Sequence, residues 1–176
     1  SGNTWRAVYT ANASDTDGAV TYSIAFSDTS GNAGTAVTSG SGSITTDTTA
    51  PTLSNVSIAS DNTNTSKARP GDDVTLTFTA SESIATPTVT FRSGGDAITD
   101  GSVVYSNTSG NTWTAVYTAN ASDTDGAVTY SIAFSDTTGN AGTAVTSGSG
   151  SVTKDTTAPT LSNVNITSDN STSTLA

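Results

Sequence analysis

The side chains of this sequence that could support binding chemistry are carboxylates. Fifteen residues are Asp or Glu, of which only Glu82 is a glutamate, and five Lys and Arg oppose them, so the net charge is −10. Hard cations such as Ca²⁺ take roughly six to eight oxygen ligands from Asp, Glu, Asn and backbone carbonyls. The composition therefore makes calcium the first ligand to consider.

Two short motifs bear on calcium locally. Asp15-x-Asp17-Gly18 and Asp123-x-Asp125-Gly126 resemble the first part of an EF-hand loop. The glutamate that closes such a loop is missing downstream, so an EF-hand is excluded. An aspartate such as Asp136, in an Asp-x-x-Gly-Asn segment, can also act only as a turn former that accepts backbone hydrogen bonds. Both interpretations, calcium ligand and turn former, stay open.

The sequence contains few side chains of the kinds that catalyse reactions. The sequence has no histidine and no cysteine, which removes the commonest general bases and thiolate nucleophiles. A serine–lysine pair would depend on Lys67 or Lys154, and the repeat described below replaces them by Leu175 and Thr46 in its other copy. We therefore predict that the protein is not an enzyme.

The acidic charge also limits the partners. A net charge of −10 repels nucleic acid and anionic lipid, so neither is expected as a partner. No apolar run approaches the roughly 20 residues that cross a bilayer. We expect no direct membrane insertion.

The elements that must position the carboxylates are predicted to be β-strands. Apolar residues alternate with threonine and serine in several runs, a period typical of half-buried strands, and Gly, Asp and Asn mark turns between them. Short strands at this spacing favour a β-sandwich. We expect strands near residues 53–58, 73–80, 88–91, 103–105, 111–118, 127–135 and 143–153.

Alternation also predicts which side chains face the core. Trp113 and its counterpart Trp5 stand in alternating runs, so we expect both to pack inward rather than to bind a ligand. The other expected core residues are Val74, Leu76, Phe78, Ala115, Tyr117, Val128, Tyr130, Ile132 and Phe134.

A long internal repeat organises the chain. Residues 1–68 recur as 109–176 with eleven differences, an offset of 108 residues, which is the size of a whole domain. We expect a window from a tandem array, with the end of one unit in 1–49, a complete unit in 50–157 and the first strand of another in 158–176. Residues 69–108 have no second copy, so we expect open-edged flanks that could pair with other copies of the chain in a crystal.

Three motifs suggest a family. They are the connector Asp-Thr-Thr-Ala-Pro-Thr at 47–52 and 155–160, Ser81-Glu82 after an expected strand, and Asp-x-x-Gly-Asn. Together they resemble the bacterial immunoglobulin-like repeats of the extender regions of large Gram-negative surface adhesins, including biofilm and ice-binding adhesins. The resemblance implies an all-β, immunoglobulin-like antiparallel sandwich of about seven strands, export to the cell surface, a rod-like array and often calcium at the junctions.

That topology specifies the metal site. In such a sandwich the loops after the second and sixth strands lie at the end where the chain enters, which gathers Asp47, Glu82 and Asp136. The preceding unit would add Asp15 and Asp17 from its lower loop, and Asp155 repeats Asp47 at the next junction. We predict calcium at these junctions.

Two functions fit these expectations. The first is a non-catalytic spacer of an extracellular adhesin, whose partners are neighbouring repeats of the same polypeptide and which projects a distal binding domain away from the cell. The alternative is an adhesive module that binds a glycan or protein directly through its loops.

Overall fold

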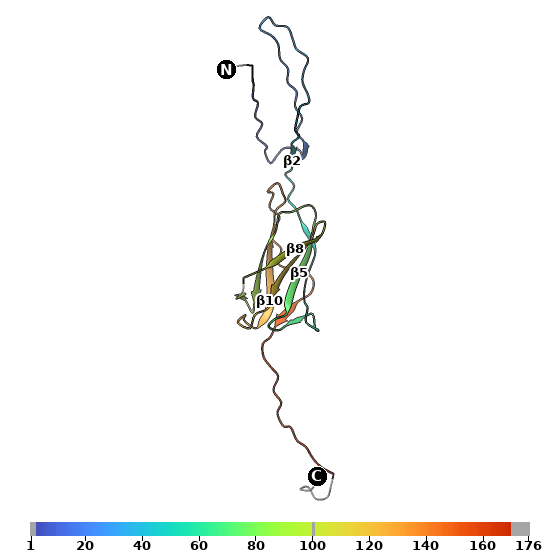
Figure 1. The fold of residues 1–176 in the computed structure, drawn as a ribbon, viewed down its shortest axis with the longest axis vertical. Coiled ribbons are helices and arrows are strands. Elements are labelled where there is room, and N and C mark those ends of the chain that lie inside the picture. Colours follow the sequence, from blue (N-terminus) through green and yellow to red (C-terminus); the bar gives the residue numbers. More distant parts are fainter. Residues whose placement is uncertain (1–2, 100, 170–176) are drawn as a thin grey trace.

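The structure, a computed structural model, describes residues 3–99 and 101–169. These residues form strands and loops and no helix, so none of them belongs to a membrane-spanning helix. Figure 1 shows a compact β-sandwich between two thin segments, the N-terminal one above it and the C-terminal one below. The predicted all-β class and sandwich architecture are confirmed.

The first sheet of the sandwich has four antiparallel strands. Their order is β3-β5-β9-β8. The bounds are β3 Leu53–Ser60, β5 Asp73–Ala80, β9 Thr112–Thr118 and β8 Val104–Ser109.

The second sheet has five strands in the order β4-β11-β10-β6-β7, antiparallel except for the β4–β11 pair. The long strands are β10 Gly126–Ala133 and β6 Thr88–Ser93. The short ones are β11 Val152–Lys154, β4 Lys67–Ala68 and β7 Asp96–Ala97. The pairs at β4 and β7 are too short for their alternation to be read from the sequence.

The core lies between the two sheets, where the alternation placed it. Val74, Leu76 and Phe78 of β5 are fully buried, and the aromatic rings of Phe91 and Tyr117 meet across the sheets with centroids 4.9 Å apart. All the expected core residues of the complete unit are buried, and Trp113 packs partly buried against them. Burial of these apolar faces is the main stabilising term.

The strand expected at 143–153 is broken. Only β11 forms as a strand there, while residues 141, 145 and 149 make isolated bridges. Ser149 instead exchanges backbone hydrogen bonds with β3, from its N–H to Val56 O at 2.8 Å and from Ile58 N–H to its own carbonyl at 3.0 Å. Strand β3 thereby contacts both sheets, which the alternation could not reveal.

The N-terminal segment differs most from expectation. Residues 1–49 repeat the sequence of the last three strands expected in the complete unit, but residues 3–49 form only β1 Gly18–Ala19 and β2 Thr45–Thr46, with isolated bridges beside them. Trp5 is 94% exposed, so its predicted core position is wrong. A strand and its apolar face need neighbours to cover them, and residues 69–108, which cover this face in the complete unit, occur once in the sequence.

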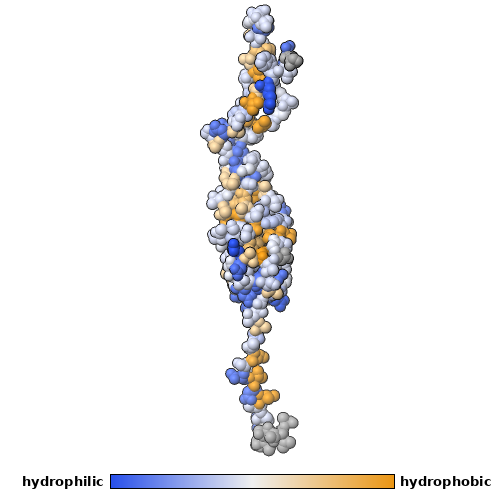
Figure 2. Space-filling model, turned by 90° about the vertical axis from the view of Figure 1, so that its left-hand side faces the viewer, coloured by the Kyte–Doolittle hydropathy of each residue, from blue (hydrophilic) through white to orange (hydrophobic). Residues whose placement is uncertain are grey.

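The C-terminal segment likewise departs from the expected strand in its described residues. Residues 158–169 run without strand pairing, and the rest of the strand expected in 158–176 lies outside the described residues. Figure 2 shows apolar side chains in orange on both thin segments. The large hydrophobic residues that are exposed on these two segments are Trp5, Val8, Tyr9, Tyr22, Ile24, Phe26, Val37 and Ile44 in the N-terminal segment, and Leu161, Val164 and Ile166 in the C-terminal one.

Candidate metal centre

Three carboxylates converge at the upper end of the sandwich. One oxygen from each of Asp47, Glu82 and Asp136 lies within 4.8 Å of the others. Asp47 follows β2 in the connector, Glu82 comes two residues after β5, and Asp136 comes three residues after β10. The structure thus brings together three residues predicted as calcium ligands, from segments far apart in the sequence.

Backbone contacts between the loops fix this convergence. Ile84 and Asp136 form an isolated antiparallel bridge, and Ala85 N–H donates to Ser135 O at 3.0 Å. On the other side, Ser81 N–H donates to Thr52 O at 2.9 Å, and Ser81 Oγ accepts from Thr52 N–H at 3.0 Å. The loop that carries Glu82 is therefore held between the connector and the loop that carries Asp136.

Asp136 is also a turn former, as the alternative interpretation proposed. Its Oδ1 accepts backbone N–H bonds from Thr138, Gly139 and Asn140 at 2.9, 2.6 and 2.8 Å, and its Oδ2 accepts from Asn140 Nδ2 at 2.7 Å. Burial alone would raise the pKa of Asp136, but hydrogen bonds from Asn140 and Thr138 outweigh it and lower the pKa to about 2. The carboxylate stays ionised, and its Oδ2 accepts only this one bond from the described residues.

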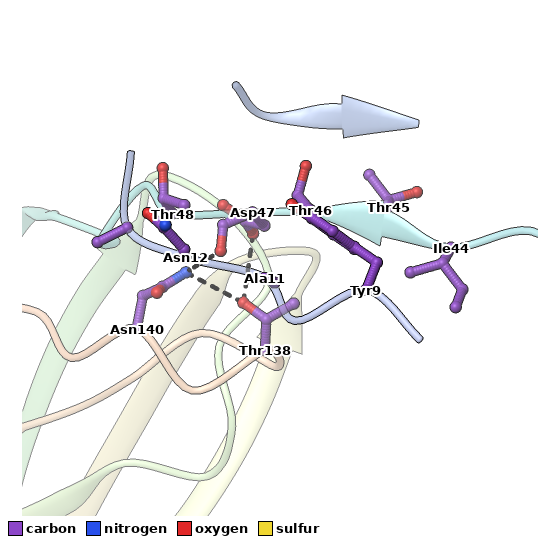
Figure 3. A pocket seen from close by; sticks show the side chains of 11 residues that line it. Tyr9, Ala11, Asn12, Ile44, Thr45, Thr46, Asp47, Thr48, Thr138 and Asn140 are labelled. Atoms are coloured by element: carbon purple, nitrogen blue, oxygen red, sulfur yellow. Dashed lines mark hydrogen bonds between the residues drawn. The ribbon is translucent and has the colours of Figure 1, made fainter. Parts of the chain in front are cut away.

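The same turn holds the connector in place. Asn140 Nδ2 donates to Asp47 O at 3.0 Å, and the Thr138 hydroxyl approaches Asp47 Oδ2 at 3.4 Å, contacts drawn as dashed lines in Figure 3. These residues line an open cleft of about 470 Å³ whose other wall includes Tyr9. The cleft lies between the N-terminal segment and the sandwich, because Tyr9 and Asn12 line it from one side and Thr138 and Asn140 from the other.

The pKa of Glu82 is shifted by desolvation and by the neighbouring carboxylates. Its pKa is raised, first by desolvation and then by the charges of Asp47, Asp136 and Asp17. The two ion pairs formed by residues 3–99 and 101–169 are Arg69–Asp72 and Lys154–Asp125, so no protein cation pairs with this group there. Several negative charges consequently face one another without a compensating side chain.

Asp17 lies beside the group rather than in it. Its Oδ1 accepts from the backbone N–H and hydroxyl of Thr48 at 2.7 and 2.8 Å, and its Oδ2 accepts from the Thr49 hydroxyl at 2.6 Å. It is not one of the residues within the 4.8 Å limit, although its charge acts on Glu82. Asp17 thus ties the N-terminal segment to the connector.

Asp15 and Asp155 are not brought to the group. Asp15 accepts hydrogen bonds from the Tyr9 hydroxyl and from Asn12 N–H, which closes its own turn. Asp155 accepts from Thr157 N–H at 2.8 Å in the lower connector, as Asp47 does from Thr49 N–H at 3.1 Å. Neither residue joins Asp47, Glu82 and Asp136, and their roles as calcium ligands stay predictions.

The donor set suits a hard cation. The carboxylates of Asp47, Glu82 and Asp136 are oxygen ligands that could supply part of a calcium shell, with water completing it. The positioning roles of Asn140 and Thr138 were missed, although the Asp-x-x-Gly-Asn motif contained the signal.

Comparisons of the chain with protein-family models, curated proteins and solved structures gave no match.

Proposed function

We propose that this protein is a spacer: a run of immunoglobulin-like units that extends a cell-surface adhesin and projects its binding domain away from the cell. The observation that carries the proposal is the position of the two connectors. The chain enters the sandwich at one end through Asp47-Thr-Thr-Ala-Pro51 and leaves at the opposite end through the same motif at 155–159 (Figure 1). Units joined in this way stack end to end and add length.

The strand order supports the immunoglobulin-like part of the proposal. The sheet β3-β5-β9-β8 has the order of the A-B-E-D sheet of such a domain, and β11-β10-β6 has the order of its G-F-C sheet. The sequence resemblance to adhesin extender repeats supplies the extracellular setting. The 57 identities in 68 aligned positions, from the eleven differences between the copies, suit a role in which length matters more than a particular surface.

Calcium is proposed as the ion that stiffens the junction. When bound, the ion would neutralise the charges of Asp47, Glu82 and Asp136, which otherwise repel one another. Asp47 belongs to the connector and the other two belong to the sandwich, so a shared ion would restrict the hinge between units. The proline of the connector limits the same hinge from the backbone side.

The calcium role is tested by melting the protein in calcium and in excess chelator. Binding to the folded state at about 100 times the Kd would add roughly 2.7 kcal/mol, which for a domain of this size corresponds to a rise of roughly 10 °C in Tm. Asp47→Asn should reduce the rise, whereas Asp155→Asn, the same change in the lower connector and outside the group of three carboxylates, should leave it intact. Equal Tm values for the wild type in both buffers would refute calcium binding.

The spacer role is tested by length. Proteins with two, three and four repeats should gain a constant increment in maximum dimension by small-angle X-ray scattering. The increment should be at least roughly 26 Å per unit, from eight-residue strands that rise about 3.3 Å per residue, and the loops and connector add to it. A maximum dimension that stops growing would contradict the spacer. The alternative, an adhesive module, would instead give saturable binding of a single unit to a glycan or protein array that loop substitutions abolish.

A further inference from the structure

The N-terminal segment contains a β-hairpin whose backbone matches part of the sandwich. Residues 18–46, called the hairpin below, repeat residues 126–154, and β1 pairs with β2 in the register of β10 with β11. Ile24 and Val37 exchange two backbone hydrogen bonds of 2.9 and 3.0 Å, and the counterpart bonds in the sandwich are 2.9 and 3.1 Å long. The hairpin therefore has its native backbone without a sandwich around it.

An aromatic side chain of the hairpin also lies where its counterpart lies. The ring of Phe26 rests so close to Gly34 that a Cβ added to that glycine would be 2.2 Å from it. The ring of Phe134 rests on Gly142 in the same way, with a corresponding distance of 2.1 Å. This part of the apolar face is thus arranged before anything covers it, and such preorganisation lowers the cost of binding a partner.

The apolar face is buried in the sandwich and exposed in the hairpin. Tyr22, Ile24 and Phe26 are 46, 53 and 54% exposed, whereas none of their three counterparts on β10 and just after it exceeds 8%. The same residue types in the same local structure therefore differ only in what lies against them. Exposed apolar surface of this kind gains free energy when a partner covers it.

The sandwich shows which segment covers this face. Strand β6 pairs with β10 and sets Val89 opposite Ile132, the counterpart of Ile24. Fully buried apolar side chains of β5 belong to the same core cluster. Both strands lie in residues 69–108, which occur once in the sequence and are used in the sandwich, and the C-terminal segment repeats neither of them.

We propose that the hairpin is a docking surface for a second polypeptide that carries the sequence of residues 50–108. The strand equivalent to β6 adds to the free edge of the hairpin through backbone hydrogen bonds, and the strand equivalent to β5 covers the apolar face. The product is one unit built from two polypeptides, which joins one chain to another. This assembly goes beyond the spacer role, in which each unit is built from one chain, and it does not depend on calcium.

The test adds a synthetic peptide of residues 50–108 to the full chain carrying Trp113→Phe. Trp5 is then the single tryptophan, because the chain has two and the peptide has none. Docking should give Trp5, now 94% exposed, the cover that leaves Trp113 partly buried in the sandwich. The fluorescence emission of Trp5 should therefore shift to the blue and saturate at one peptide per chain. The absence of a saturable shift up to about 100 µM peptide, enough to reveal even micromolar affinity, would overturn the proposal.

Two substitutions in the hairpin of that chain locate the docking. Ile24→Asp places a charge on the face to be covered and should abolish the shift. Thr21→Asp is the matched control, because its counterpart Thr129 is exposed in the sandwich, and it should bind the peptide within about twofold of the parent chain. Equal responses of the two variants would contradict docking at this face. A chain with Trp5→Phe, which keeps Trp113, should show no shift; a shift there would mean that the peptide exchanges into the sandwich, and would also overturn the proposal.

Discussion

The contact between β3 and the segment that precedes β11 gives the sharpest prediction of the structure. Gly148 approaches β3 so closely that a Cβ added to it would lie 2.4 Å from Val56 O and 2.8 Å from the Tyr130 hydroxyl oxygen. Real Cβ atoms essentially never come that close, so Gly148→Ala must push the two backbones apart. The change tests whether β3 joins both sheets or only the one formed with β5.

The magnitude follows from what the displacement breaks. The two backbone hydrogen bonds of Ser149 with β3, 2.8 and 3.0 Å long, would be stretched, at about 1 kcal/mol each. Overpacking adds about 1–3 kcal/mol. We expect Gly148→Ala to lower the free energy of unfolding by about 3 kcal/mol, or to lower Tm by roughly 10–20 °C. Gly101→Ala is the control, because its Cβ would meet no atom within 4 Å.

Urea unfolding followed by tryptophan fluorescence measures this difference. Trp113 lies partly buried against the core while Trp5 is 94% exposed, so the change in signal reports the sandwich. The midpoint should shift while the slope with urea stays constant, since the same surface is exposed on unfolding. A Gly148→Ala protein that unfolds within about 0.5 kcal/mol of wild type, as Gly101→Ala should, would refute the proposed close contact.

Two further predictions concern polar groups. The buried Tyr117 hydroxyl has no hydrogen-bond partner among the described residues, so Tyr117→Phe should leave the free energy of unfolding unchanged or raise it slightly. Tyr105→Phe removes the hydroxyl that accepts from Val89 N–H, so it should lower the free energy of unfolding in urea by about 1 kcal/mol. Folding lowers the pKa of Asp136 from an ordinary 3.8 to about 2, so its stabilisation is complete above pH 4 and lost as the pH falls through 2. The Tm of wild type should drop more over that window than the Tm of Asp136→Asn; equal drops would contradict the assignment.

Much of the sandwich was predictable because its strands are regular. The bounds expected for β5, at 73–80, match the structure, since each apolar residue there faces the core and each threonine faces outward. The prediction of one continuous strand at 143–153 was wrong because this stretch is irregular. Its glycines leave no side chains to alternate, and their role is to let β3 come close.

The candidate site was predicted in part. Asp47, Glu82 and Asp136 converge because loops at one end of a sandwich must meet, whatever their side chains. Asp15 could not be placed by the same rule, because its position depends on a turn closed by Tyr9 and Asn12. The prediction for Trp5 was wrong because alternation identifies an apolar face but does not say whether anything covers it.

The sequence by itself determined the repeat, the strand alternation and the set of acidic residues, since these depend only on the order of residue types. Tertiary structure decided which carboxylates meet, which tryptophan is covered, and that Lys154 pairs with Asp125 while its counterpart Thr46 donates to backbone carbonyls. The physical reason is that burial and charge compensation depend on neighbours in space, and two nearly identical stretches of this chain have different neighbours.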